Sequence, residues 1–324
     1  MSLLGFWKDH IFANFDAPME DLSEKTAVLT GAISGRIAYH VAVHLLRNNL
    51  SRLVIAARSV DRGKKAKATM LSEVSAYKGC IEIWSLDMAD FGSCRAFARR
   101  VNCELDRIDI FLANAGTYPV TWKLTKDGYE ERLQVNVIAT GLLCLLVLPA
   151  LAKTARSTKQ KPRLSITSSA VHAWTPFKEQ SEKNIIGSLN EQTAQKDIFD
   201  CYSITKLLEI YIIEALARLP IAEQVILNAV GPGLIMSPLY RDTTAIQKRI
   251  TSAIGWTSEK GSRNVSWAIM KGYTSGAFVE KCQETAPSVR LVTSDNGQRI
   301  RGQVWSELRA IYKKVAPEVE PLLR

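Results

Sequence analysis

The chain has 324 residues and a formal net charge of +10, from 42 basic and 32 acidic side chains. Hydrophobic residues make up 47% and charged residues 23% of it, which is ordinary for a globular protein and excludes intrinsic disorder. The positive charge is compatible with binding to nucleic acid, a membrane surface or a phosphorylated small molecule. Composition alone does not choose among these partners.

The six cysteines show no close C-x-x-C pair and no regular spacing. This pattern indicates reduced thiols in a cytoplasmic protein, with neither a disulfide framework nor a metal site. The first fifteen residues are interrupted by Lys8, Asp9 and His10, so they lack the apolar core of a secretory signal. We therefore interpret residues 1–24 as a surface arm or a docking helix.

Short apolar runs alternate with longer segments of 3.6-residue period, which predicts strands alternating with helices. The predicted strands are 27–30, 53–57, 81–86, 108–113, 164–167 and 225–230, and the predicted helices are 35–48, 61–76, 91–105, 129–152 and 202–219. This order predicts an α/β fold with a doubly wound parallel sheet and helices on both faces. We expect one domain over 25–324, with loops at about 170–200 and 235–257 and a C-terminal helical extension.

Residues 133–152 contain no charged side chain. Because they include polar residues and a proline, a buried core or oligomer helix is favoured over a transmembrane segment. Residues 153–163 then carry five positive charges and no acid. No aromatic residues are interleaved with these charges, so we interpret the run as solvated surface and expect no nucleic-acid partner.

A glycine-containing turn follows the first predicted strand, with Gly31 and Gly35 ahead of a helix. Glycines at such a junction let backbone amides approach a phosphate, although two glycines also suit an ordinary tight turn. Arg58 ends the second predicted strand, where an acid would hold the ribose of NAD. An arginine there favours the 2′-phosphate of NADP; the alternative is a solvated side chain in a basic helix.

Seven short motifs occur along the chain in a familiar order. They are Thr30-Gly31 with Gly35 (Ile37 stands where a third glycine is expected), Asp87, Asn114-Ala115-Gly116, Asn136, Ser169, Tyr202 with Lys206, and Pro232-Gly233 with Ser237. In this order they resemble the short-chain dehydrogenase/reductase family, which implies a Rossmann-type fold. The surrounding sequence is similar to the retinol-dehydrogenase-like or protochlorophyllide-reductase-like branch, and within it to fungal members that often serve secondary metabolism.

The resemblance implies that the chain binds NADP(H). The implied cofactor residues are Gly31, Gly35, Arg36, Ile37, Arg58, Asp87, Asn114, Tyr202, Lys206, Ile235 and Ser237. Ile37 departs from the family pattern, because the glycine it replaces permits close packing of helix on strand. The helix must therefore move outward or leave a gap for the isoleucine. Arg36 either reaches a phosphate or faces solvent.

The predicted catalytic residues are Ser169, Tyr202, Lys206 and Asn136. Tyr202 and Lys206 are four residues apart, so they share one helix face, and an ammonium beside a phenol lowers the pKa of the phenol. Tyr202 would give a proton in reduction and accept one in oxidation. Ser169, with Ser168 as its rival, would hold the substrate oxygen. The resemblance links Asn136 through water to Lys206, and Lys206 to the nicotinamide ribose.

We expect an NADPH-dependent oxidoreductase that interconverts a ketone or aldehyde and an alcohol on an apolar small molecule. Two alternatives stay open: a non-redox cyclase or isomerase, and a binding protein in which Ile37 impairs the cofactor site. The side chains that either line an apolar substrate pocket or pack locally are Trp174, Phe177, Leu234, Tyr240 and Trp256. Helices 133–152 and 202–219 resemble the family's dimerisation pair, which implies a homodimer or homotetramer.

Overall fold

The computed structural model describes residues 13–194, 197–235, 255–285 and 289–324. Within them the strands form one eight-stranded sheet in the order β3-β2-β1-β4-β5-β6-β7-β8. The strands are β1 (Thr26–Thr30), β2 (Arg52–Ala57), β3 (Cys80–Ser85), β4 (Ile110–Ala113), β5 (Arg163–Thr167), β6 (Ile226–Val230), β7 (Ala277–Glu280) and β8 (Gln283–Thr285). Neighbouring strands from β3 to β7 pair in parallel, and β8 pairs with β7 antiparallel.

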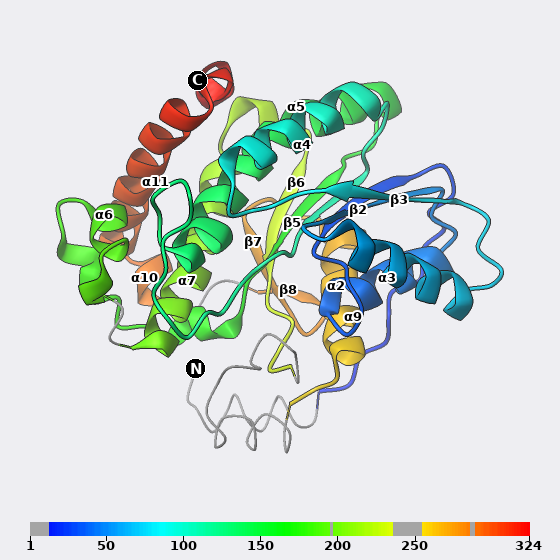
Figure 1. The fold of residues 1–324 in the computed structure, drawn as a ribbon, viewed down its shortest axis with the longest axis horizontal. Coiled ribbons are helices and arrows are strands. Elements are labelled where there is room, and N and C mark those ends of the chain that lie inside the picture. Colours follow the sequence, from blue (N-terminus) through cyan, green and yellow to red (C-terminus); the bar gives the residue numbers. More distant parts are fainter. Residues whose placement is uncertain (1–12, 195–196, 236–254, 286–288) are drawn as a thin grey trace.

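The sheet is buried on both faces, which explains why its strands read as short apolar runs. In β1, Val28 belongs to one hydrophobic cluster, while Ala27 and Leu29 belong to the other. Helices α2, α3 and α9 cover one face, and α4, α5 and α7 cover the other (Figure 1). The predicted α/β fold with a doubly wound parallel sheet is therefore confirmed.

The helices of the first half begin and end within a few residues of their predicted limits. They are α2 (Ile37–Arg47), α3 (Val60–Glu73) and α4 (Phe91–Glu104). Side chains cap two of them: the Ser59 hydroxyl accepts from the backbone N–H of Arg62, and the Asp90 carboxylate accepts from that of Gly92. Such capping groups replace backbone partners that the first helical turn lacks.

The helix predicted over 129–152 is built differently. It begins with a π-helical turn, η1 (Leu133–Ile138), and continues as α5 (Ala139–Thr158). The π turn widens the helix by one residue per turn at the position of Asn136, and such turns are frequent at functional sites. The helix also extends six residues beyond its predicted end, so the basic run begins inside it.

The apolar helix belongs to the core of this chain. Leu133–Thr158 is long and apolar enough to cross a membrane by length and composition, but 94% of its most apolar window is buried inside the protein. It packs against α4, α7 and the C-terminal segment, and the described part of the chain contains one helix of this kind. The exposed side chains of Lys153 and Arg156 mark where the helix reaches the surface.

Residues 170–200 do not form the long loop that we predicted. They contain η2 (Ala170–Trp174), η3 (Lys178–Ser181), α6 (Ile185–Leu189), η4 (Gln192–Ala194) and the start of α7 (Ile198–Leu216). Polar residues that suggested a solvated loop act as caps: Asn184 accepts from the N–H of Gly187 at 3.0 Å, and Asp197 accepts from that of Phe199 at 2.9 Å. Tyr202 consequently lies one turn inside α7 and not at its start.

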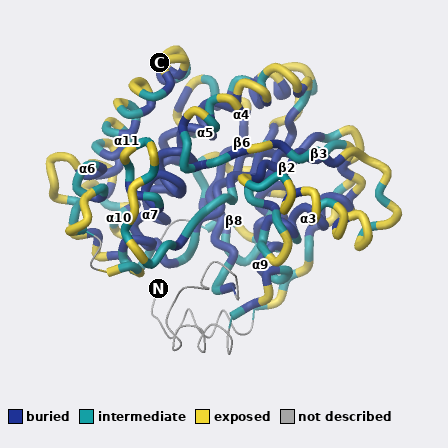
Figure 2. The backbone as a smooth tube through the Cα atoms, in the orientation of Figure 1, coloured by how far each residue is buried: buried dark blue, intermediate teal, exposed yellow. Residues whose placement is uncertain are grey.

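Among the described residues, the C-terminal part adds α9 (Ser258–Met270), α10 (Arg290–Thr293), α11 (Asp295–Val315) and the 3₁₀ segment η7 (Pro317–Leu323). A further 3₁₀ segment, η5 (Pro220–Ala222), precedes β6. α11 presents Ile300, Val304, Leu308 and Tyr312, four residues apart, to the α5–α7 side of the sheet. Its opposite side is exposed (Figure 2). Strands β7 and β8 were not predicted, because four and three residues are too short for a periodic signal.

Candidate functional site

Two adjoining pockets lie at the carboxyl ends of the parallel strands. The first, which we call the glycine-turn pocket, includes Gly31, Arg58, Arg62 and Asp87 in its lining. The second, the tyrosine pocket, is lined by Ile37, Asn114, Ser169, Tyr202, Lys206 and Ile235 among others. Arg36, Gly116 and Thr117 line both. Ligands of doubly wound sheets bind at this edge.

Glycine is needed at two positions of the first turn, because Gly31 and Gly35 have φ angles of +74° and +76°. A Cβ atom on Gly31 would also lie 3.2 Å from the Cα of Ala115. The hydroxyl of Thr30 accepts hydrogen bonds from the backbone N–H groups of Asn114 (2.9 Å) and Ala115 (2.8 Å). These hydrogen bonds hold the ends of β1 and β4 together. A ligand could therefore come close to the backbone at Gly31.

Ile37 is accommodated at the start of α2. Its side chain is half-buried, packs against the α2–α9 cluster and lines the tyrosine pocket. The turn keeps its position against α9, where the Ser258 hydroxyl donates to the carbonyl oxygen of Gly35 at 3.2 Å. Arg36 is the half-buried N-cap residue and lines both pockets. The isoleucine is therefore accommodated by packing against the α2–α9 cluster.

The glycine-turn pocket is rich in guanidinium groups. Arg36, Arg58 and Arg62 line it, and the latter two are exposed. Asp87 follows β3, and its carboxylate accepts from the N–H of Ala89 at 3.0 Å. This donor set fits a nucleotide that carries an additional phosphate, since arginine binds phosphate through paired N–H groups.

Three predicted catalytic residues meet in the tyrosine pocket. Tyr202 and Lys206 are both buried on α7, and the Lys206 ammonium lies 5.4 Å from the centre of the Tyr202 ring. Ser169 follows β5 and is half-buried in the same pocket. The pocket therefore holds a phenol, an ammonium and a hydroxyl together.

The two adjacent serines have different roles. Ser168 is buried, and its hydroxyl donates to the backbone carbonyl oxygen of Lys206 at 2.8 Å, which ties α7 to the end of β5. The hydroxyl of Ser169 accepts a long bond from the N–H of Val171 at 3.3 Å, and it keeps its own proton for another partner. The geometry thus favours Ser169 over Ser168 as the residue that would bind a substrate oxygen.

Asn136 is buried in the π turn and lines neither pocket. Its side chain accepts from the N–H of Thr117 at 2.9 Å and donates to the carbonyl oxygen of the same residue at 3.0 Å. It also donates to the Thr205 hydroxyl at 3.3 Å. Asn136 therefore fixes the segment that lines both pockets, and its direct partners do not include Lys206.

Lys206 has a partner that the sequence analysis missed. Its ammonium donates to a carboxylate oxygen of Glu209 at 2.8 Å and to the carbonyl oxygen of Thr167 at 3.1 Å. Burial raises the pKa of Glu209 to about 7, although the positive charge of Lys206 acts against this rise. A signal was available, because Glu209 is an acid within the apolar run Leu207–Ile213.

The last predicted cofactor residues lie after β6. Ile235 is buried and lines the tyrosine pocket, whereas Ser237 and Tyr240 lie outside the described residues. Gly233 has a φ of +89°, and a Cβ there would lie 2.5 Å from the ring of Trp256. The ring of Trp256 therefore packs directly on this turn of the backbone, and Trp256 is 7% exposed.

The aromatic residues proposed for an apolar pocket separate into two groups. Phe177 is wholly buried in the main hydrophobic cluster, so of the two alternatives it packs locally. Trp174 packs beside Tyr202 and stacks on Phe199, with ring centres 6.3 Å apart. Tyr118, which the sequence analysis did not single out, packs edge-on against Tyr202 at 4.8 Å.

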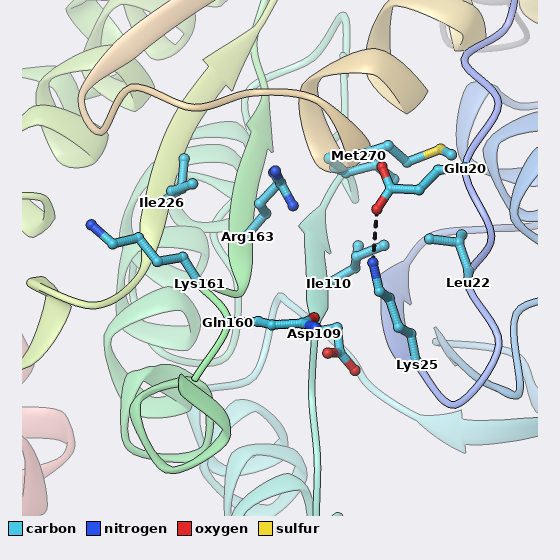
Figure 3. A pocket seen from close by; sticks show the side chains of 11 residues that line it. Glu20, Leu22, Lys25, Asp109, Ile110, Gln160, Lys161, Arg163, Ile226 and Met270 are labelled. Atoms are coloured by element: carbon cyan, nitrogen blue, oxygen red, sulfur yellow. Dashed lines mark hydrogen bonds and ion pairs between the residues drawn. The ribbon is translucent and has the colours of Figure 1, made fainter. Parts of the chain in front are cut away.

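A further cavity of about 420 Å³ lies at the opposite edge of the sheet (Figure 3). It is lined by residues at the amino ends of the strands, including Asp109 before β4 and Arg163 at the start of β5. An ion pair between Lys25 and Glu20, 2.7 Å long, lies at its wall. The cavity is remote from Tyr202 and Ser169, so it is not part of the candidate site.

The sequence of the chain matches known proteins along its whole length. A family model described as short chain dehydrogenase matches residues 25–170. The chain is 36% identical over 323 residues to the short chain dehydrogenase/reductase dmxR8 of a Cryptosporiopsis species, covering 98% of this chain and 99% of that protein. It is 33% identical to the short-chain dehydrogenase/reductase ffsI of Aspergillus flavipes, covering 99% and 95% of the two chains.

Solved structures share the fold at lower identity. A protein of Mycobacterium paratuberculosis superposes with a TM-score of 0.67 at 23% identity, covering 92% of this chain and 96% of that chain. The Pseudomonas aeruginosa RhlG/NADP complex superposes with a TM-score of 0.56 at 24% identity, covering 80% and 95%. On its relatives' identity and coverage together with this architecture, the chain belongs to the short-chain dehydrogenase/reductase family of oxidoreductases.

Proposed function

We propose that the chain is an NADPH-dependent oxidoreductase that interconverts a ketone or aldehyde and an alcohol on an apolar small molecule. The observation that carries this proposal is the meeting of Ser169, Tyr202 and Lys206 in one pocket that adjoins an arginine-lined pocket at a glycine turn. One pocket can hold the reacting carbonyl while the other holds the nucleotide.

The cofactor would lie across both pockets, and when bound it supplies or accepts the hydride. Gly31 and Gly35 leave the backbone of the first turn open to phosphate. Arg36 and Arg58 would bind phosphate groups, with Asp87 on the adenine side. On the nicotinamide side the candidates are Asn114, Ile37, Ile235, Ser237, Tyr202 and Lys206.

In the proposed reaction, the Tyr202 phenol donates a proton to the substrate oxygen during reduction and accepts one during oxidation. The buried ammonium of Lys206 stabilises the phenolate that remains. The Ser169 hydroxyl donates to the same substrate oxygen as negative charge develops on it. Asn136 positions the Thr117 segment between the pockets and so acts through the backbone.

We favour NADPH over NADH because the end of β2 carries Arg58 and because Arg62 lines the same pocket. A carboxylate at the end of β2 would repel a 2′-phosphate, and the chain has none there. The accommodation of Ile37 argues against the alternative of a binding protein with an impaired cofactor site.

We place the substrate among apolar intermediates of fungal secondary metabolism, because fungal short-chain dehydrogenases/reductases match nearly the whole chain. The proposed location is the cytoplasm, from the cysteine pattern of the sequence. Tyr118 and Trp174 beside Tyr202 suit an apolar substrate. The predicted homodimer or homotetramer is a separate question. Tyr312 of α11 fills the groove at Gly141 between α5 and α7, so these helices are covered within one chain. Light scattering decides the oligomeric state.

The test is a set of apolar ketones incubated with NADPH and followed by product mass and NADPH absorbance. We expect a two-dalton gain that forms far more slowly with Tyr202→Phe. A product of unchanged mass would establish the non-redox cyclase or isomerase instead. A chain that fails to bind NADPH at millimolar concentration would disprove the oxidoreductase proposal.

A further inference from the structure

A buried ion pair lies directly beneath the candidate catalytic tyrosine. Glu209 follows Lys206 by three residues on α7, so both project from neighbouring positions on one helix face. Their charged groups are 2.8 Å apart, and the side chains are 7% and 3% exposed for Lys206 and Glu209 respectively. The pair is therefore shielded from bulk water, and its two charges attract each other more strongly than they would in water.

Stability alone does not account for this pair. Removing two charges from water costs free energy that their attraction often fails to return, and apolar residues of similar size are frequently as stable. The second carboxylate oxygen of Glu209 is buried and makes no hydrogen bond of ordinary geometry among the described residues, although the Ser168 hydroxyl lies near enough to act against the rise in the pKa of this carboxyl. A buried charge pair next to a candidate reaction centre, with one carboxylate oxygen weakly bonded, indicates a functional reason for its presence.

The geometry defines what Glu209 does to Lys206. An ammonium has three N–H donors; here one is bound by the Glu209 carboxylate and one by the Thr167 carbonyl oxygen. These two acceptors fix the ammonium 5.4 Å from the centre of the Tyr202 ring and leave one N–H for the pocket. Without Glu209, the long lysine side chain would lose one of its two anchors.

We propose that Glu209 is a positioning residue of the proton-transfer machinery, which fixes the Lys206 ammonium and uses its negative charge to limit how strongly that ammonium favours the phenolate form of Tyr202. The proposal rests on the proposed function in one respect, the role of Tyr202 as the proton donor. Glu209 itself touches neither pocket, since it lines neither of them.

The groups around Glu209 support the view that its negative charge acts on Tyr202 through Lys206. From α5, the Cys144 thiol faces the carboxylate, and from α11, Tyr312 lies next to Cys144; burial raises the pKa of both well above their ordinary values. Both groups are therefore neutral near neutral pH. The hydroxyl of Ser168, at the end of β5, carries no charge. Among the described residues, Lys206 is thus the charged partner of Glu209.

The experiment is a pH titration of Tyr202 by the ultraviolet absorbance of phenolate. The contribution of Tyr202 is obtained in each background as the difference between the chain and its Tyr202→Phe variant, without cofactor or substrate. Glu209→Gln keeps the length and the acceptor oxygen of the side chain but removes its charge. Glu214→Gln is the matched control, because Glu214 lies on the same helix but pairs with Arg301.

We expect the ionisation midpoint of Tyr202 to fall by about one pH unit in Glu209→Gln and to stay unchanged in Glu214→Gln. An unmoved or raised midpoint in Glu209→Gln, or an equal shift in Glu214→Gln, would overturn the proposal. If Glu209→Gln does not fold, Glu209→Met tests the same shift with an apolar side chain of similar length. Turnover by Tyr202→Phe at the rate of the parent chain would instead disprove the proposed function, so the two failures are distinguishable.

Discussion

The glycine-turn pocket and the tyrosine pocket share lining residues but differ in the kinds of group that form them. The first is formed by backbone held open at Gly31 and by guanidinium groups that reach the surface, such as that of Arg58. The second is formed by side chains that are buried and paired, above all Tyr202 and Lys206. Exposed charges interact with each other weakly because water screens them, whereas buried charges act on each other strongly. We therefore expect the first pocket to set cofactor affinity and the second to set rate and pH dependence.

The largest effect is expected in the tyrosine pocket. Tyr202→Phe removes the proton donor but keeps the aromatic ring that packs against Tyr118, so kcat should fall by roughly 10²–10⁴-fold with little change in the Kd for NADPH. Steady-state kinetics and cofactor titration measure the two quantities separately. If the Kd for NADPH rose by the same factor as kcat fell, the two pockets would not have the separate roles that we propose.

The second effect is on stability, and it comes from Glu209. Burial raises the pKa of this carboxyl from 4.5 to about 7, so the folded chain holds the proton more tightly than the unfolded chain does. The resulting contribution to stability is complete below pH 4.5 and is lost as the pH rises to about 7, amounting to about 3 kcal/mol. Between pH 5 and pH 8, the unfolding free energy of Glu209→Gln should rise relative to that of the parent chain by about 2–3 kcal/mol, as measured by urea unfolding. An equal stability difference at both pH values would contradict the account.

A smaller effect is expected in the glycine-turn pocket. Arg58→Ala removes an exposed guanidinium and should raise the Kd for NADPH about tenfold, with the Kd for NADH nearly unchanged. Arg99→Ala, on the exposed side of α4, is the matched control for lost surface charge. If both variants weaken NADPH binding equally, the general positive charge of the chain, and not Arg58, attracts the cofactor.

The smallest effect is expected on stability, from the hydrogen bonds that connect β1 and β4 beside the glycine-turn pocket. Thr30→Val deprives the backbone N–H groups of Asn114 and Ala115 of their acceptor, which should cost about 1 kcal/mol of unfolding free energy. Thr30→Ser retains the hydroxyl and should retain the stability. Thermal unfolding compares the two, and a loss in Thr30→Ser with none in Thr30→Val would show that the methyl group of Thr30, and not its hydroxyl, holds the turn.

Local chemistry explains which parts of the fold were predictable. Strands such as β1 and β2 are buried on both faces, so each reads as an apolar run between turns. The segment 170–200 was misinterpreted because Asn184 and Asp197 cap the helices α6 and α7, and a capping residue resembles a loop residue in sequence. Strand β8 has three residues and is fixed by its neighbour β7, which no local pattern reveals.

The candidate site was predictable where a residue acts through spacing along the chain. Tyr202 and Lys206 share a helix, so four residues of separation suffice to place them together. Contacts such as the packing of Tyr118 on Tyr202 join residues 84 positions apart and depend on how β4 and α7 are arranged. The choice between Ser168 and Ser169 likewise required the structure, because only the direction of each hydroxyl separates them.

The central claim is that the two pockets serve one hydride transfer in which Tyr202 supplies the proton. Its most direct test uses NADPH deuterated at the transferable position, a reactive apolar ketone, the parent chain and Tyr202→Phe. The account predicts one deuterium on the carbinol carbon of the product from the parent chain, and far slower labelling by the variant despite bound NADPH. Product without deuterium, or equal rates from the two chains, would contradict it.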